Sequence, residues 1–180
     1  MANTLVLYTS KRGSTQQYAE WIAESRDTKC LPLNQVKFED VVDCDAVVYG
    51  GWLRGSGIVG FDKFKKLIPG MEDRVVLFVT GISDYNPANY MQICDINFDS
   101  MEDAAKMQLF FCPGRYDVAK VRGLDKIMMK FAKSVLKGGK TPDGAMDAER
   151  MVEAIEKGVD KVDIKYTEPV VRAVKKLLAK

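Results

Sequence analysis

Short, uninterrupted runs of hydrophobic residues recur along the chain, with polar or helix-periodic segments between them. These runs are rich in β-branched and aromatic residues, which is typical of strands buried on both faces of a parallel sheet. A weaker run at 30–33 contains Pro32, which favours an edge strand. The four strong predicted strands lie at 5–8, 46–49, 75–79 and 109–112.

Segments with hydrophobic residues at helical spacing follow the predicted strands. Residues 15–24 and 61–68 each gather their large apolar side chains on one helical face. Beyond the last strand, further periodic segments lie at 124–137, 147–157 and 170–179. Alternating strands and helices predict an α/β fold with a doubly wound parallel sheet. In such a fold, ligands bind beyond the carboxyl ends of the strands.

Composition and charge narrow the chemistry that this fold can carry. The 180 residues include no histidine, which excludes imidazole bases, histidine-containing triads and histidine-ligated metals. The net charge of +2 gives no strong field for nucleic acid. The four cysteines are far apart and are expected to be buried or free thiols, with no metal site. With no signal-peptide pattern and no 18-residue apolar run, the chain is expected to be cytoplasmic.

A hydroxyl- and glycine-rich loop separates the first predicted strand from the helix after it. Hydroxyls, a glycine that allows a tight turn and free amides at a helix N-terminus together favour binding of a phosphate. The alternative is that these residues only cap the helix, and no Walker A pattern is present. The candidate binding residues are Thr9, Ser10, Lys11, Gly13, Ser14 and Thr15.

The loops after the second and third strong strands are candidates for holding a flat ligand. In the second loop, glycines permit close backbone approach and Trp52 offers a ring for stacking, unless Trp52 is simply a core residue. In the third, Tyr85 is a candidate for the other ring face, although the loop also has ordinary turn composition. The G-x-G-x-x-G letters at 55–60 do not directly follow a strand, which argues against a dinucleotide site. The candidate residues are Gly50, Gly51, Trp52, Leu53, Arg54, Gly55, Gly81, Ser83 and Tyr85.

The loop at 9–15 resembles the phosphate-binding loop of the flavodoxin-like family of FMN proteins in position and in residue types. The likeness extends over about residues 4–155. Within that family, the segments at 48–55, 61–64 and 113–137 are similar to the short group that contains menaquinone-dependent protoporphyrinogen dehydrogenase. The extra segment between the last strand and the last helix is typical of that group.

This resemblance implies a five-stranded parallel sheet in the order 2-1-3-4-5, flanked by helices, with FMN as cofactor. The FMN phosphate would bind the first loop, and the isoalloxazine ring would lie between the Trp52 and Tyr85 loops. Arg115 and Tyr116 would either meet a substrate at the open edge of the ring or serve the structure. We expect an FMN-binding domain over 1–160 and an amphipathic helical tail over 161–180.

Two functions follow from the resemblance, and the residues leave open whether the chain is an enzyme. The first is an FMN-dependent oxidoreductase that acts on a quinone or a porphyrinogen-like small molecule. The alternative is an electron carrier that docks to redox proteins. Carriers of this family tend to be strongly acidic, which suits basic docking faces, so the net charge of +2 favours the first function.

Two basic amphipathic segments near the C-terminus could bear on partners. For 124–137, we expect a helix packed on the domain with its lysines in solvent. For the tail, the alternatives to such packing are a protein partner, a second copy of the chain or an anionic membrane surface. The predicted apolar stripes are Leu124, Ile127, Met128, Phe131 and Val135 in the first segment, and Val170, Val171, Val174, Leu177 and Leu178 in the tail.

Overall fold

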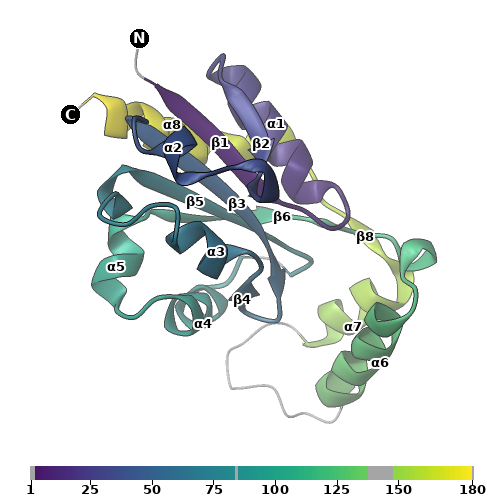
Figure 1. The fold of residues 1–180 in the computed structure, drawn as a ribbon. Coiled ribbons are helices and arrows are strands. Elements are labelled where there is room, and N and C mark those ends of the chain that lie inside the picture. The colour runs from purple at the N-terminus through teal and green to yellow at the C-terminus, as the bar shows by residue number, and fades with distance from the viewer. Residues whose placement is uncertain (1–2, 84, 138–147, 180) are drawn as a thin grey trace.

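The computed structural model describes residues 3–83, 85–137 and 148–179, and it has three layers with a parallel sheet at the centre (Figure 1). The strands lie in the order β2-β1-β3-β5-β6, which confirms the predicted 2-1-3-4-5 order and fold class. A short strand β4 (Gly57–Ile58) pairs antiparallel with the end of β3. The parallel strands are β1 (Thr4–Thr9), β2 (Lys29–Pro32), β3 (Ala46–Arg54), β5 (Val75–Gly81) and β6 (Leu109–Pro113).

Helices cover both faces of the sheet (Figure 1). On one face lie α1 (Ser14–Ser25) and α8 (Glu168–Leu178). The other face is covered by α2 (Phe38–Val41), α3 (Phe61–Lys65), α4 (Pro87–Asn97) and α5 (Met101–Lys106). Short 3-10 helices lie at Leu33–Gln35, Glu72–Arg74, Val118–Lys120 and Ile164–Thr167.

The remaining elements lie beyond the carboxyl ends of the strands. Helices α6 (Leu124–Lys137) and α7 (Ala148–Lys157) pack against each other beside the main body (Figure 1). The short strands β7 (Arg115–Tyr116) and β8 (Val159–Asp160) form a separate antiparallel pair. This insertion between the last long strand and the last helix agrees with the extra helical segment predicted there.

The uninterrupted hydrophobic runs are explained by burial of both faces of the sheet. In β1, Leu5 and Leu7 belong to the core under α3 and α4, whereas Val6 belongs to the core under α1 and α8. In β5, Leu77 and Phe78 divide in the same way. Because alternate side chains point to opposite faces, a strand covered on both faces needs hydrophobic residues at every position.

Helices α4 and α5 were not predicted from the hydrophobic pattern, although both carry recognisable start signals. The side chain of Asn86 accepts a hydrogen bond from Ala88 N, and Pro87 occupies the first turn of α4. The side chain of Ser100 accepts one from Asp103 N at the start of α5. Polar residues that cap and a proline at the first turn are standard helix starts. These helices were missed because the prediction relied on apolar periodicity, which is weak in them.

The two basic amphipathic segments differ in burial, and one of them differs from what the sequence led us to expect. In α8, Val170 and Val174 are fully buried in the core that Val6 and Phe78 also form. The stripe of the tail is therefore covered by the chain's own sheet, which is the packing that the sequence left open beside a partner, a second copy or a membrane. In α6, the expected packing through its stripe is wrong, because most of that stripe is exposed.

The described residues carry no further obvious chemistry in the form of metal sites or reactive thiols. Within residues 3–83, 85–137 and 148–179, no group of three or more cysteine or acidic side chains could hold a metal ion. The four cysteines are free, as expected, and burial raises the pKa of Cys112 to about 12. None of the helices in these ranges is long and apolar enough to cross a bilayer.

Candidate functional site

A cavity of about 230 Å³ lies beyond the carboxyl ends of the central strands. Its walls come from the β1–α1 loop, the ends of β3 and β5, the start of β7, and α6. This is the place at which doubly wound sheets bind ligands. The lining residues are Ser10, Lys11, Arg12, Ser14, Thr15, Trp52, Leu53, Arg54, Gly55, Thr80, Gly81, Ile82, Gly114, Arg115, Tyr116, Asp125, Met128, Met129 and Ala132.

The β1–α1 loop forms the polar end of this cavity. Gly13 precedes α1 with φ +91, a left-handed conformation that side chains rarely adopt. Its amide donates to Ser10 Oγ at 3.1 Å, which closes the turn. Because glycine has no side chain that could cap the helix, the amides of the first turn remain available for an anion.

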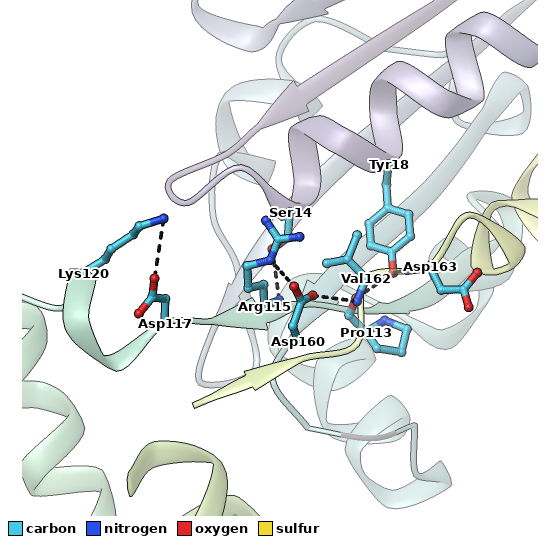
Figure 2. Close-up of polar contacts among 9 residues, drawn as sticks. All are labelled: Ser14, Tyr18, Pro113, Arg115, Asp117, Lys120, Asp160, Val162 and Asp163. Atoms are coloured by element: carbon cyan, nitrogen blue, oxygen red, sulfur yellow. Dashed lines mark hydrogen bonds and ion pairs between the residues drawn. The ribbon is translucent and has the colours of Figure 1, made fainter. Parts of the chain in front are cut away.

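Buried hydroxyl groups of the first turn of α1 tie the floor of the cavity together. Thr15 Oγ1 lies 2.7 Å from Thr80 Oγ1 at the end of β5, and both residues are buried. Ser14 Oγ accepts a hydrogen bond from Arg115 N at 3.0 Å (Figure 2). The start of α1 is thereby fixed against β5 and β7, which are remote in sequence, so the polar end is held in place before any ligand arrives.

Tyr18, one turn further along α1, fastens the helix to the segments around the site. Its hydroxyl donates to Pro113 O at 2.7 Å and accepts from Asp163 N at 3.2 Å (Figure 2). Burial raises the pKa of Tyr18 to about 12, so the phenol keeps its proton at neutral pH. Tyr18 therefore joins α1, the end of β6 and the segment that leads into α8.

Trp52 adds an aromatic surface to the lining of the cavity. The Arg54 guanidinium carbon lies 5.2 Å and Lys11 Nζ 5.7 Å from the centroid of its ring. Both distances are within the range of cation–π attraction. The indole is half-buried, so it is not the fully buried core residue that the sequence left as an alternative. This wall of the cavity thus combines a flat apolar ring with positive charge.

The two cations of the first loop are paired with a carboxylate of α6. Lys11 Nζ lies 2.7 Å from Asp125 Oδ1, and Arg12 Nη2 lies 3.0 Å from Asp125 Oδ2. Hydrogen bonds from Lys11 and then Arg12 hold the pKa of Asp125 below its ordinary value. The Arg12 guanidinium also lies 5.1 Å from the ring centroid of Tyr116. Asp125 therefore ties α6 to the phosphate-binding loop.

Helix α6 closes the cavity with apolar side chains. Met128, Met129 and Ala132 line it, one turn and two turns after Asp125. Spacings of three and four residues place these side chains on the same side of the helix as Asp125. The cavity consequently has a hydroxyl-rich end at α1 and an apolar wall made by Trp52, Leu53 and α6.

Several residues predicted from the sequence lie outside the cavity. Gly50 and Gly51 are buried within β3, where an added Cβ would meet the Phe78 ring at 2.1 Å and Ile58 Cγ2 at 2.5 Å. They are thus required for packing across the sheet. The predicted residues outside the lining are Thr9, Gly13, Gly50, Gly51, Ser83 and Tyr85.

The third loop is split between two places. Gly81 and Ile82 line the cavity beside Trp52, whereas Ser83 and Tyr85 line a separate hollow against α7. The Tyr85 ring is 62% exposed and lies 6.3 Å from the Tyr90 ring. The structure therefore does not bring Tyr85 opposite Trp52.

Thr9, which lies outside the cavity, is hydrogen-bonded to the hydroxyl of Tyr49. The Tyr49 hydroxyl lies 2.8 Å from Val59 O and 2.9 Å from Thr9 Oγ1. Because a carbonyl only accepts, Tyr49 donates to Val59 and Thr9 donates to Tyr49. Burial raises the pKa of Tyr49 to about 12. Thr9 therefore supports the strand beneath the loop.

Arg115 lies at the cavity wall, but its Nε is engaged by a carboxylate outside the cavity lining. Its Nε donates to Asp160 Oδ2 at 2.6 Å, across the β7–β8 pair (Figure 2). Asp160 also accepts from Val162 N through its other oxygen, at 3.2 Å. These contacts favour the structural alternative that the sequence left open for Arg115.

Half of the cavity residues that the sequence did not name as candidates come from α6: these are Asp125, Met128, Met129 and Ala132, and the others are Arg12, Thr80, Ile82 and Gly114. Asp125 meets Lys11 across 114 positions, and no local pattern announces such a pairing. Met129 and Ala132 were read only as part of an amphipathic helix. Thr80 directly follows the strand predicted at 75–79, and its hydroxyl was the available signal. Long-range placement of α6 was the missing information.

Comparison with known proteins identifies a family for most of the chain. A family model for the flavodoxin domain matches residues 5–143. Among curated proteins, nothing matches. The family assignment rests on the family model alone.

Solved structures with similar folds were also found, all at low identity. A flavodoxin from the domain Archaea is 14% identical, with 86% of this chain and 97% of that chain covered and a TM-score of 0.42. A flavodoxin, WrbA-like protein from Agrobacterium tumefaciens is 14% identical, with 98% and 99% covered and a TM-score of 0.47. Rubredoxin oxygen:oxidoreductase from Desulfovibrio gigas is 17% identical, with 99% of this chain but 37% of that chain covered and a TM-score of 0.45.

Proposed function

Since the chain belongs to the flavodoxin domain family, we propose that it binds FMN in the cavity beyond β1, β3 and β5 and exchanges electrons with a small molecule. FMN, when bound, supplies the one- and two-electron redox chemistry that this histidine-free chain does not itself provide. The protein's part is to hold, orient and shield that cofactor.

The polarity of the cavity is the observation that carries this proposal. Its lining combines the Ser10, Ser14 and Thr15 hydroxyls at the N-terminus of α1 with the apolar side chains of Trp52 and the α6 methionines. FMN has the same polarity, with a phosphate at one end and a flat, largely apolar ring at the other. The residues present therefore fit the cofactor that the family implies.

Different parts of the lining would bind the phosphate and the ring of FMN. The first-turn amides of α1, with Ser10 and Thr15, would bind the phosphate, and the helix dipole favours its charge. Lys11 and Arg12 would compensate the phosphate charge once it competes with Asp125 for them. Trp52 would stack on the ring, and the α6 methionines would exclude water from it.

A small-molecule substrate is favoured over a docked redox protein. Met128 and Met129 give the cavity an apolar wall, which suits a hydrophobic molecule such as a quinone or a porphyrinogen-like compound. The net charge of +2 lacks the acidity that suits a carrier docking to basic faces. We therefore propose electron or hydride exchange with a quinone or porphyrinogen-like molecule, of the menaquinone-dependent protoporphyrinogen dehydrogenase type.

Titration with FMN tests the cofactor. Quenching of flavin fluorescence at micromolar protein is expected, and its absence would overturn the proposal. Trp52→Ala should weaken binding by about tenfold through lost stacking. Tyr85→Ala is the matched aromatic control, and it should leave the affinity unchanged because Tyr85 lines a different hollow. Equal losses in both variants would place the ring between the two loops instead.

Reoxidation of the reduced FMN-bound protein tests the substrate class. After anaerobic reduction, a soluble quinone should reoxidise the flavin in stopped-flow measurements faster than an oxidised electron-carrier protein does. Replacing Met129 by Gln should slow the quinone reaction, and titration of the same variant with FMN separates lost quinone reactivity from lost cofactor. Fast exchange with the carrier protein and none with quinones would favour the carrier function.

A further inference from the structure

Helix α6 exposes a continuous row of large hydrophobic side chains, which we call the α6 patch: Leu124, Ile127, Met128 and Phe131. Their exposed fractions are 78%, 65%, 49% and 71%. The spacing of three and four residues places them along one side of the helix. Contiguous apolar surface of this kind marks an interaction site, whereas isolated exposed hydrophobic residues are ordinary.

The charge around the α6 patch has one sign. Lys126 and Lys130 are exposed, and helical spacing places them on the polar side of α6, away from Leu124, Ile127 and Phe131. The single acidic residue of α6, Asp125, is turned away from the patch toward Lys11 and Arg12. The outer surface of the helix therefore presents apolar side chains and cations, with no carboxylate of its own.

We propose that the α6 patch binds the surface of an anionic lipid bilayer, with the helix lying in the plane of the interface. Helices with this division of residues insert their apolar side at the boundary between headgroups and acyl chains. Lysines on the polar side of such a helix attract it to the negative surface of acidic lipids.

A bilayer fits the α6 patch better than a second copy or a protein partner does. A second copy paired through the same helix offers no negative charge to the lysines of α6, because the one carboxylate of α6, Asp125, is paired with Lys11 and Arg12. The face of a single helix is convex, and Leu124, Ile127 and Phe131 line none of the three cavities described among the placed residues. A fluid apolar surface with negative charge needs no matching pocket.

Docking in this way places the cavity at the membrane surface. Met129 and Ala132 of the same helix line the cavity, and α6 lies at the periphery of the molecule in Figure 1. A lipid-soluble molecule could then pass between the bilayer and the cavity along α6. Membrane docking itself does not depend on FMN, so failure of FMN binding leaves the docking proposal standing and the reverse also holds.

Vesicle sedimentation with the full-length protein tests the docking. Vesicles of equal parts phosphatidylcholine and phosphatidylglycerol should carry down the protein, whereas pure phosphatidylcholine vesicles should carry down much less. Replacing both Lys126 and Lys130 by Gln should weaken binding to the acidic vesicles by about thirtyfold, because each cation near the surface contributes about 1 kcal/mol. Added salt should weaken the wild-type protein in the same direction.

A matched pair of apolar substitutions shows whether the α6 patch is the site. Phe131→Ser should weaken vesicle binding by at least about tenfold, since a large apolar side chain no longer enters the interface. Ile96→Ser on α4, at 58% exposure, is the control and should bind like the wild-type protein. Equal binding by both variants and the wild-type protein would overturn the proposal.

A tryptophan placed in the patch reports insertion directly. The emission of Phe131→Trp should be quenched by brominated phosphatidylglycerol, and that of Ile96→Trp should not be. Analytical ultracentrifugation without lipid should give a monomer for the wild-type protein. A dimer that Phe131→Ser dissociates, with no lipid quenching of Phe131→Trp, would show that a second copy covers the patch and would overturn the proposal.

Discussion

Helices α6 and α8 have the same kind of amphipathic sequence, but the apolar side is buried in α8 and exposed in α6. Each has an apolar stripe and a row of basic residues. Val170 and Val174 of α8 are fully buried, whereas Ile127 and Phe131 of α6 are among the exposed large hydrophobic residues. Amphipathic periodicity therefore establishes that a helix has two sides, but not which surface its apolar side will cover.

The difference comes from what the rest of the chain leaves uncovered. Helix α8 lies beside α1 over β3 and β5, where it covers sheet surface that α1 alone does not reach. The other sheet face is already covered by α2 to α5. Helix α6 is held instead through Asp125 to the first loop and through α7, whose Glu156 pairs with Lys133 at 2.6 Å. Its apolar row therefore remains outside.

An aspartate placed on the apolar stripe of each helix should give the largest difference in the free energy of unfolding. Val174→Asp would bury an unpaired carboxylate and should lower the free energy of unfolding by roughly 3–5 kcal/mol. Ile127→Asp is the matched control, and it should change that free energy by less than about 0.5 kcal/mol. Urea denaturation followed by circular dichroism measures both. Comparable losses would mean that the α6 patch is buried in solution.

Removing the buried hydroxyl of Tyr18 should lower the free energy of unfolding, but by less than the charge in α8 does. Tyr18→Phe leaves Pro113 O and Asp163 N without their partner at the point where the chain leads into α8 (Figure 2). Loss of such a buried contact should cost about 1–3 kcal/mol of unfolding free energy. Tyr85→Phe, on an exposed ring, should cost nothing measurable in the same denaturation experiment. An unchanged Tyr18→Phe protein would contradict the role of this hydroxyl in fixing α8.

Acid should weaken the ion pairs that hold α6 while leaving α8 unaffected. This is the smallest of the expected effects. Hydrogen bonds from Lys11 and Arg12 lower the pKa of Asp125, and those from Lys133 and Lys137 lower the pKa of Glu156. Because the folded-state pKa values are depressed, this stabilisation is fully present above the ordinary values of 3.8 and 4.5. It is lost as the pH falls through the lowered values.

Amide hydrogen exchange read by mass spectrometry, corrected for the intrinsic pH dependence, measures this loosening. Exposed ion pairs are weak, so peptides of α6 should exchange only about twofold to fivefold faster after protonation. Peptides of α8 should be unaffected over the same range. The variant carrying both Asp125→Asn and Glu156→Gln should show the faster exchange already at neutral pH. Protection of α6 that is independent of pH in the wild-type protein would exclude these ion pairs as its anchors.

The parts of the fold that depend on continuous burial were predictable from the chain. Every position of a two-sided strand such as 75–79 must be apolar, so the strands appear directly in the hydrophobic pattern. The polar end of the cavity was also predictable, because Ser10, Ser14 and Thr15 adjoin one another in sequence. Features built from neighbouring residues carry their signal locally.

Features built from remote residues were not predictable in this way. Gly50 and Gly51 look like loop glycines that approach a ligand, yet they make room for Phe78 and Ile58. Tyr85 follows the correct strand, but it lies on the α7 side of the third loop. The pairing of Asp125 with Lys11 and Arg12 depends on where α6 comes to rest.

The sequence by itself determined the strands, the doubly wound sheet and the hydroxyl-rich loop before α1, because each follows from the local order of polar and apolar residues. Only the tertiary structure decided which amphipathic helix is buried. Burial depends on the sheet surface that other elements leave uncovered. The sequence of α6 or α8 alone does not indicate where that surface is. For the same reason, the apolar wall of the cavity and the exposed α6 patch became visible only in three dimensions.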